Sequence, residues 1–417
     1  MSSVRDHPGR TRLQRLLEGG GAIAGAIVVM NVATYGFQMI AARMLGPAEY
    51  GAVAGLMALY LVASVLQIGL QTTAARRISA SPDAVDEIER TILTLASRLS
   101  LALGGLLLVL APLVQHTLRL ESIYPALLLA VAAVPLTVQG AQAGILQGER
   151  RWLWLALHYT AAGVPRLLIG VVAMWVRPTE GAAMAAVALA TFAPVVVGRI
   201  ALRRRDHRGR PGEEGGHRLR AAFAESMHGS LAMLAFLAIT NADILIARNV
   251  LSEHDSGLYA GGLILTKAVL FLPQFVVVVA FPALATGRER RRTLLRGLAG
   301  VCVLGAGCVL GSVALSGIAM QFVGGRDYAE IEERLWLFAA LGTVLACLQL
   351  LVYAVLARQS RRSSYLMLAA VATLLAVSPG IDSLDRLLLT VAAVDAALLL
   401  ALLALSLWRM RHDLVGR

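Results

Sequence analysis

Long apolar runs, separated by short clusters of charged residues, dominate the chain. No Asp, Glu, Lys or Arg occurs in residues 19–42, 50–75, 123–148 or 297–325. A helix that crosses a membrane needs about 20 mostly apolar residues, because each residue adds about 1.5 Å toward about 30 Å of hydrocarbon. The runs are continuous rather than alternating, which predicts helices and not barrel strands. We expect twelve spans, near 20–42, 50–72, 94–115, 123–147, 152–176, 180–201, 221–247, 257–283, 297–323, 335–357, 364–381 and 387–408.

The basic residues predict which ends of these spans face the cytoplasm. With a cytoplasmic N-terminus, 29 arginines lie on or beside the cytoplasmic segments and seven on the outer loops. Cytoplasmic loops of membrane proteins carry such an excess of basic residues. The tryptophans fall at span ends, where interfacial aromatic residues gather, at positions 152, 154, 175, 336 and 408. Both termini are therefore expected in the cytoplasm.

Composition agrees with a membrane protein and narrows the classes of function. Of the 417 residues, 58% are hydrophobic and 15% charged, whereas a soluble domain has roughly 25% charged residues. The formal net charge of +12 raises the question of nucleic acid. The longest basic stretch, residues 199–220, contains no aromatic residue for base stacking and adjoins a membrane span. Orientation and attraction to anionic lipid explain it, and no nucleic-acid partner is expected. The three cysteines and the histidines form no metal or cofactor motif.

The chain contains an internal repeat at about half its length. GFQMIAARMLGPAEYGAVAGL (36–56) aligns with NADILIARNVLSEHDSGLYAGGL (241–263). With a short gap, Gln38 pairs with Asp243, Arg43 with Arg248, Gly51 with Gly257 and Gly55 with Gly262. Two six-helix halves that start on the same side predict parallel repeats, with a cavity between two lobes that rock. The expected parts are an N-terminal tail (1–19), a first lobe (20–202), a basic linker (203–219), a second lobe (220–408) and a C-terminal tail (409–417).

Four ionisable residues lie deep inside predicted spans, where burial in hydrocarbon is unfavourable and marks functional positions. Lys267 is the only lysine in the chain, and Arg166 directly follows Pro165. Asp243 lies in the seventh span and Asp395 in the twelfth. Structural explanations stay open for each of them. In these explanations, Lys267 forms an ion pair with Asp395, Asp243 pairs with Arg248, and Arg166 caps the carbonyl groups that Pro165 leaves without a hydrogen-bond donor.

The functional interpretation is a wet, positively charged cavity. Arg166 and Lys267 at mid-depth suit an anionic head group such as a pyrophosphate, with Asp243 nearby. Sugar hydroxyls need neutral hydrogen-bonding partners, and such side chains are spread over the spans. They are Asn31, Gln38, Gln67, Gln71, Gln139, Gln142, His158, Asn241 and Gln274. Single polar residues also join helices to one another, so each one alone is a weak signal. We take Asn31, Gln38, Asn241 and Gln274 as candidate cavity residues.

Several of these segments resemble a known family. AARMLGPAEYGAVAGLMALYLV (41–62), NADILIAR (241–248), SGLYAGGLILTKAVLFLPQ (256–274) and FPALA (281–285) are similar to the polysaccharide-biosynthesis membrane proteins. These are oligosaccharide-lipid flippases of the multidrug/oligosaccharidyl-lipid/polysaccharide (MOP) exporter superfamily. The resemblance covers the start of both halves, and VPRLLIGVV (164–172) also fits it.

The resemblance implies an all-α integral membrane fold, with two six-helix lobes in a parallel repeat like that of the multidrug and toxin extrusion (MATE) transporters and MOP flippases. It implies a bacterial inner-membrane flippase that moves an undecaprenyl-pyrophosphate-linked oligosaccharide outward. Asp243 and Lys267 match polar cavity positions of the family's seventh and eighth helices. Many members have fourteen spans, and twelve are expected here.

Two other functions compete with this one. An ion-coupled drug or metabolite exporter of the same superfamily needs cavity carboxylates for Na⁺ or H⁺, but here Arg166 and Lys267 oppose a cationic drug. A membrane polysaccharide polymerase or ligase needs a catalytic set on a large outer loop. The longest outer loop, near 324–334, carries no such set, and no HExxH, GxSxG or phosphate-binding glycine loop occurs. We therefore expect a transporter and not an enzyme.

Overall fold

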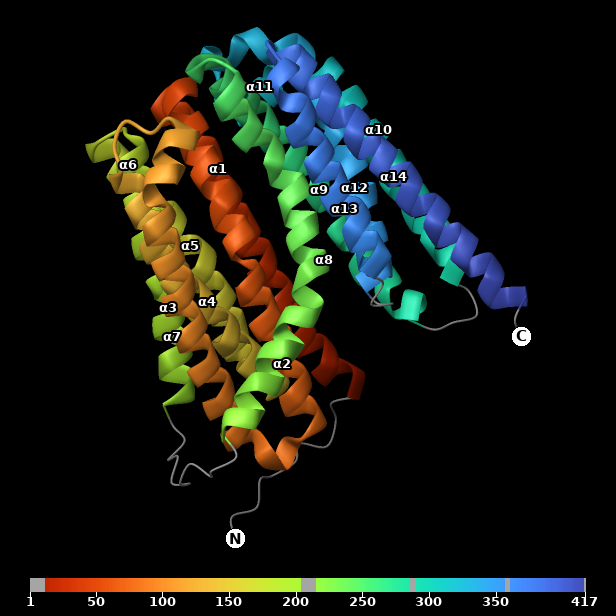
Figure 1. Ribbon diagram of the computed structural model, residues 1–417. Helices are drawn as coiled ribbons and strands as arrows, with labels where there is room; N and C mark the ends of the chain where they lie inside the picture. The colour runs from red at the N-terminus through yellow and green to blue at the C-terminus, as the bar shows by residue number, and fades with distance from the viewer. Residues whose placement is uncertain (1–11, 204–214, 286–289, 357–360, 416–417) are drawn as a thin grey trace.

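The computed structural model describes residues 12–203, 215–285, 290–356 and 361–415. Within these ranges the chain is helical and contains no strand, as expected (Figure 1). The helices are α1 (Arg12–Ala63), α2 (Val65–Ala80), α3 (Val85–Leu118), α4 (Tyr124–Gly148), α5 (Trp152–Val176), α6 (Glu180–Ala190), α7 (Phe192–Leu202), α8 (Gly215–Val250), α9 (Glu253–Ala285), α10 (Arg290–Ala314), α11 (Ser316–Val323), α12 (Leu335–Leu356), α13 (Arg361–Val377) and α14 (Leu384–Val415), with 3₁₀ turns η1 (Pro82–Ala84), η2 (Arg326–Arg334) and η3 (Ser378–Gly380).

Helix α1 is two helices that meet at a glycine corner. Gly46 has φ 71° and ψ 176°, a left-handed conformation that favours glycine, and Pro47 cannot donate a backbone hydrogen bond. The helix therefore ends and restarts there. The first limb (12–45) is the first expected span, and the second limb (47–63) continues through α2 as the second.

The helices account for all twelve expected spans. Among the described residues, ten helical segments are long and apolar enough to cross a membrane, and the first of them, Gly21–Ala80, contains both limbs of the corner. Helix α9 coincides with the eighth expected span. The sixth and ninth spans are each broken in two, at Thr191 between α6 and α7 and at Leu315 between α10 and α11.

The helices form two groups joined by α8. Helices α1–α7 form the first half and α9–α14 the main body of the second, whose first span is α8 (Figure 1). Helix α1 begins and α14 ends at the same face, here called the terminal face. The corner at Gly46 lies at the other, which we call the far face. The halves meet at the far face and diverge toward the terminal face. Helix α8 packs against α1, α2 and α3 of the first half and against α13 of the second.

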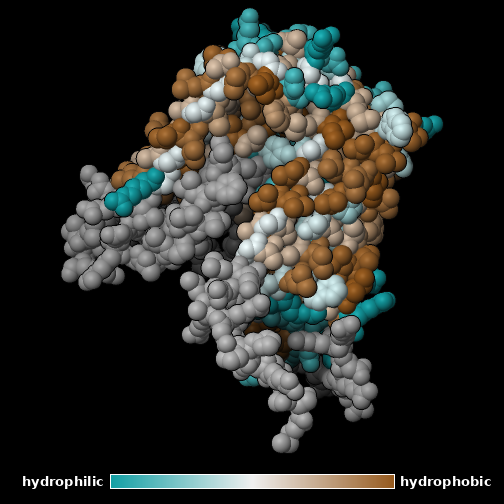
Figure 2. Space-filling view, turned by 180° about the vertical axis from the view of Figure 1, so that it is seen from behind, coloured by the Kyte–Doolittle hydropathy of each residue, from teal (hydrophilic) through white to brown (hydrophobic). Residues whose placement is uncertain are grey.

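The surface between the two faces is apolar. Figure 2 shows hydrophobic residues in a broad band, with hydrophilic residues gathered at the ends of the molecule. Large apolar side chains point outward, including Val109 at 77% exposure and Leu310 at 70%. Such a band is unfavourable in water and favourable against lipid. The protein is thus a multi-pass membrane protein.

Glycines let α4 pack closely on α2. Gly140, Gly144 and Gly148 recur every four residues along one face of α4. A Cβ atom built on Gly140 would lie 2.3 Å from the carbonyl oxygen of Gln67, and one on Gly144 would lie 2.4 Å from that of Gln71. Small residues at this spacing are typical of membrane helices whose backbones touch. They give the first half a tightly packed inner layer.

Candidate functional site

A pocket lies between the two halves, near the corner of α1. It is a small pocket, with a free volume of about 10 Å³, about the space that one water molecule needs. Both limbs of α1 line it, together with α8 and α9. The wall is mostly apolar and contains two polar side chains from the sequence prediction, Gln38 and Lys267. Its other lining residues are Phe37, Tyr50, Val53, Ala54, Met57, Ile244, Ala260 and Leu263.

Lys267 brings a positive charge to this pocket. Its Nζ donates a hydrogen bond to Oδ1 of Asn241 on α8, at 3.2 Å. No ion pair within 4 Å involving Lys267 is found among the described residues, so the alternative explanation, an ion pair with Asp395, does not hold in this conformation. The ammonium group is close enough to Asp243 for an electrostatic attraction between them. Lys267 therefore retains hydrogen-bond donors for a ligand that enters the pocket.

Two buried carboxylates, those of Asp243 and Asp395, lie close to each other. Asp243 is 2% exposed, and its Oδ2 accepts a hydrogen bond from the Tyr259 hydroxyl at 3.1 Å. Asp395 on α14 is 1% exposed, and neither of its carboxylate oxygens has a hydrogen-bond partner among the described residues. Asp243 and Asp395 are near enough to repel each other. A buried carboxylate without a partner is strongly unfavourable unless it is protonated or binds a cation.

Arg166 lies elsewhere, inside the first half. It is 8% exposed, and its Nη2 donates to the Tyr60 hydroxyl at 3.1 Å, with the guanidinium 5.2 Å from the centre of the Tyr60 ring. Its Nε has no hydrogen-bond partner among the described residues. Arg166 and Lys267 therefore do not line the same pocket here, although Tyr60 is three residues beyond the lining residue Met57.

The remaining candidates divide between the pocket and its surroundings. Asn241 is buried, and its side-chain oxygen accepts the hydrogen bond from Lys267. Its amide nitrogen donates to the Leu237 carbonyl at 2.9 Å. Asn31 is partly buried on the first limb of α1, outside the pocket lining. The side chain of Gln274 lies outside the described part of the structure.

At the far face, Arg248 and Arg119 each donate hydrogen bonds to backbone carbonyls across the contact between the halves. Arg248, at the end of α8, is 2% exposed and donates to the Leu118 carbonyl at the end of α3, at 2.8 and 2.6 Å. It also donates to the Arg119 carbonyl at 3.1 Å. Arg119 in turn donates to the carbonyl groups of Leu251 and Asn249 at 2.8 and 2.7 Å. Arg248 thus binds helix-end carbonyls and not Asp243, so the alternative explanation of Asp243 as the partner of Arg248 does not hold in this structure.

Residues that align in the repeat also meet at this face. A Cβ atom on Gly51 would lie 3.1 Å from backbone atoms of Gly257, and one on Gly257 would lie 1.8 Å from the Pro47 carbonyl oxygen. Here two glycines allow the backbones of α1 and α9 to touch. The repeat pointed to Arg248 and to these glycines. Sequence reasoning offered Arg248 only as a partner for Asp243 and gave the glycines no role, and it assigned no contact to Arg119, Tyr60 or Tyr259.

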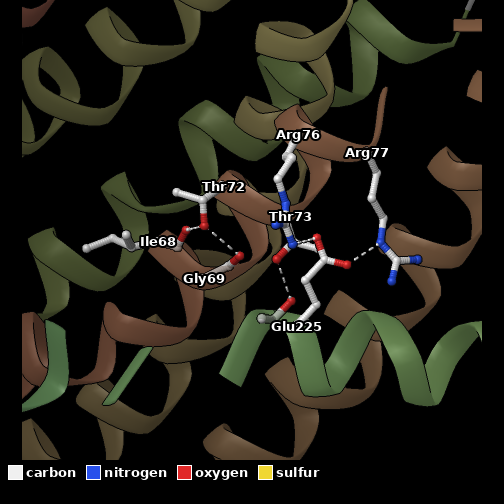
Figure 3. A network of polar contacts seen from close by, with 8 residues as sticks. Ile68, Gly69, Thr72, Thr73, Arg76, Arg77 and Glu225 are labelled. Carbon is white, nitrogen blue, oxygen red and sulfur yellow. Dashed lines mark hydrogen bonds and ion pairs between the residues drawn. The ribbon is translucent and has the colours of Figure 1, made fainter. Parts of the chain in front are cut away.

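A polar cluster joins α8 to the first half near the terminal face (Figure 3). Glu225 on α8 forms ion pairs with Arg76 and Arg77 on α2, the latter at 2.8 Å. One turn away on α2, the Thr73 hydroxyl accepts a hydrogen bond from Ser226 at 3.1 Å. The cluster fixes this end of α8 on the first half, while the other end of α8 contributes Asn241 and Asp243 to the second.

Solved structures with the same fold are membrane transporters. The chain resembles an inward-facing multidrug resistance MATE family transporter of the MOP superfamily, with a TM-score of 0.68 and 14% identity over 93% of this chain and 95% of that one. It resembles the MATE multidrug transporter DinF-BH, with a TM-score of 0.63 and 15% identity over 95% and 94%. An outward-facing MATE family transporter gives 0.59 and 14% over 97% and 99%. These likenesses establish the fold. A search of curated proteins finds no match.

A family model identifies the chain more closely than these distant structures do. The model described as polysaccharide biosynthesis protein matches residues 16–287, which begin inside α1 and continue through α9. This range contains the corner of α1, Asp243 and Lys267. The resemblance seen in the sequence is therefore confirmed, and so is the MATE-like all-helical fold. The chain belongs to the polysaccharide biosynthesis protein family, and its fold resembles that of a MATE family transporter of the MOP superfamily.

Proposed function

We propose that the protein is a flippase for a lipid-linked oligosaccharide of the undecaprenyl-pyrophosphate type in a bacterial cytoplasmic membrane. The observation that carries this proposal is the pocket between the halves, to which the only lysine of the chain brings a positive charge. An ammonium group with free donors suits an anionic pyrophosphate. Gln38 beside it offers an amide to sugar hydroxyls.

The lipid-linked substrate enters from the terminal face, which we assign to the cytoplasm because the arginine-rich segments adjoin it. In the present conformation the halves are held together at the far face by Arg248, Arg119 and the Gly51–Gly257 contact. When these contacts break and the terminal face closes, the pocket opens to the outer side of the membrane. This is alternating access by rocking of two lobes.

We further propose that Asp243 and Asp395 bind the coupling cation, Na⁺ or H⁺. Two buried carboxylates that repel each other, one of them without a hydrogen-bond partner, bind a proton or a small cation favourably. The Tyr259 hydroxyl bound to Asp243 adds an oxygen atom to the site. Because Asp243 also attracts Lys267, cation binding there weakens the hold on Lys267 and frees it for the substrate.

A drug exporter of the same superfamily is the competing function. An organic cation entering this pocket meets Lys267, and like charges repel. The proposal therefore favours an anionic substrate, and the experiment below includes a cationic dye as a comparison.

The test uses purified protein in liposomes and a fluorescent undecaprenyl-pyrophosphate-linked oligosaccharide, with a membrane-impermeant reductant that quenches only exposed label. Lys267→Ala should lower the flipping rate at least tenfold, and Lys267→Arg should retain more activity than Lys267→Ala. Arg177→Ala, which removes an exposed positive charge near the far face, should behave like wild type. Unchanged flipping by Lys267→Ala, or transport of a cationic dye in place of the lipid, would overturn the proposal.

A gradient experiment on the same liposomes tests the cation. An imposed Na⁺ or H⁺ gradient should accelerate flipping by wild type and leave the rate of Asp395→Asn unchanged. If Asp395→Asn responds to the gradient as wild type does, Asp395 is not the coupling site.

A further inference from the structure

Two of the three cysteines of the chain touch each other inside the second half. Cys302 on α10 and Cys347 on α12 are 45 residues apart in the sequence, and their Sγ atoms lie 3.8 Å apart. This distance is within the hydrogen-bonding range of sulfur. Cys347 is 3% exposed, whereas Cys302 is exposed at the surface of its helix. The two thiols therefore form a pair with one member on the surface and the other behind it.

Close packing of the two helices holds this contact in place. One turn from the thiols, a Cβ atom on Gly305 of α10 would lie 2.2 Å from the Thr343 side chain on α12. A glycine at such a position lets two membrane helices approach closely. An S–S bond is about 2.05 Å long, so the sulfurs have to approach by only about 2 Å to become bonded.

The surface around Cys302 is apolar and faces lipid. The adjacent Val303 is 72% exposed, and no Asp, Glu, Lys or Arg occurs in residues 297–325. A charged, water-soluble oxidant is excluded from hydrocarbon because its desolvation is unfavourable. A reagent that reaches Cys302 therefore has to dissolve in the membrane. Quinones are membrane-soluble two-electron oxidants, and a quinone is the final acceptor of thiol oxidation in the bacterial periplasm.

We propose that Cys302 and Cys347 are a redox-active thiol pair, which a membrane quinone converts into a disulfide between α10 and α12. Both S–H bonds break and one S–S bond forms. The two electrons and two protons pass to the quinone, whose carbonyl oxygens become the hydroxyl groups of a quinol. Cys302 meets the oxidant at the lipid surface, and Cys347 completes the bond from inside the half. The inference does not depend on the identity of the transported molecule.

The disulfide connects helices that lead to the contact between the halves. Helix α10 continues through the break at Leu315 into α11, whose Gln321 carbonyl accepts a hydrogen bond from Arg43 of the first half. Helix α12 packs against α9, which carries Lys267. Oxidation therefore restrains two elements on which this contact and the pocket depend. It also restricts the unfolded chain, so the oxidised protein should unfold at a higher temperature than the reduced protein.

The test treats the full chain in lipid nanodiscs with a short-chain quinone whose ring carbons are all substituted, so that it oxidises thiols without alkylating them. Free thiols are then blocked in denaturant and counted by mass spectrometry. In wild type, two of the three thiols should be lost, and one peptide pair should contain Cys302 bonded to Cys347. Oxidised glutathione, which stays in water, should react at least about tenfold more slowly at the same concentration.

Cys308→Ser is the matched control. Cys308 lies on the same helix as Cys302, and no other thiol contacts it among the described residues. This variant should form the bond as wild type does. Cys302→Ala and Cys347→Ala should each keep both remaining thiols, and either variant suffices if the other fails to insert. The proposal is overturned if wild type keeps three free thiols, if the quinone bonds two copies through Cys302, or if oxidised glutathione reacts equally fast.

Discussion

Arg43 and Arg248 make equivalent contacts from opposite halves of the molecule. Arg43, at the end of the first span, donates to the Gln321 carbonyl in α11 at 2.9 Å. Arg248, at the end of the seventh span, donates to the Leu118 carbonyl in α3. Helices α3 and α10–α11 are the third spans of their halves, and the two arginines align in the repeat. Each half thus uses the same residue to bind the third span of the other half.

The first prediction concerns Arg248. Arg248→Ala removes several charge-assisted hydrogen bonds at the far face, a loss of about 2 kcal/mol, or roughly thirtyfold in the equilibrium for closing that face. The probe is Ser256→Cys, a buried interface position, in a background without Cys302, Cys308 and Cys347. Labelling by an impermeant maleimide should accelerate in Arg248→Ala and stay slow in Arg177→Ala. Equal labelling rates in both variants would show that Arg248 does not hold the face closed.

The second prediction concerns the glycine contact. Gly257→Ala places a methyl group against the Pro47 carbonyl, where backbone must move, and such overpacking is unfavourable by about 1–3 kcal/mol. Gly51→Ala, with its closest contacts at 3.1 Å, should have the same direction and a smaller size. Gly307→Ala meets nothing within 4 Å and is the control. The same labelling assay should rank Gly257→Ala above Gly51→Ala and Gly51→Ala above the control; the reverse order would contradict the contact.

The third prediction separates stability from transport at Asp395. Replacing the partnerless carboxylate with leucine removes an unfavourable buried polar group, so Asp395→Leu should be more resistant to thermal unfolding by about 1 kcal/mol or more. Its flipping activity should be lost. Asp382→Asn, an exposed change in an i,i+4 pair with Arg386, should alter neither property. A destabilised Asp395→Leu would mean that the carboxylate has a structural partner.

The fourth prediction concerns Glu225. Glu225→Arg places a third positive charge beside Arg76 and Arg77 and should release this end of α8, measured as faster proteolysis after the linker. Combining it with Arg76→Glu and Arg77→Glu restores opposite charges and should restore protection. Asp83→Asn serves as a nearby control on an exposed turn. If the variant with exchanged charges is cleaved as fast as Glu225→Arg, the ion pairs do not hold this end of α8 on α2.

Hydropathy alone predicted the spans because each span is a local property of about 20 residues. It did not predict the breaks at Ser64, Thr191 and Leu315, since the flanking runs remain apolar and helical on both sides. Depth and polarity led to Lys267 and Gln38, and both line the pocket between the halves. Their role in binding a substrate stays a prediction. The partner of Arg166 was not foreseen, because Tyr60 is 106 residues away and nothing local selects one tyrosine over another.

Helix α8 is attached to both halves, so any motion of one half relative to the other acts on this helix. One end is bonded to α2 through Glu225 and Ser226, and the other packs against α13 and carries Asp243. In the proposed alternating-access cycle, rocking of the halves requires this helix either to bend or to separate from α2. The stiffness of α8 therefore contributes to the energy barrier of the proposed cycle. The strength of the ion pairs at Glu225 determines whether α8 bends or separates from α2.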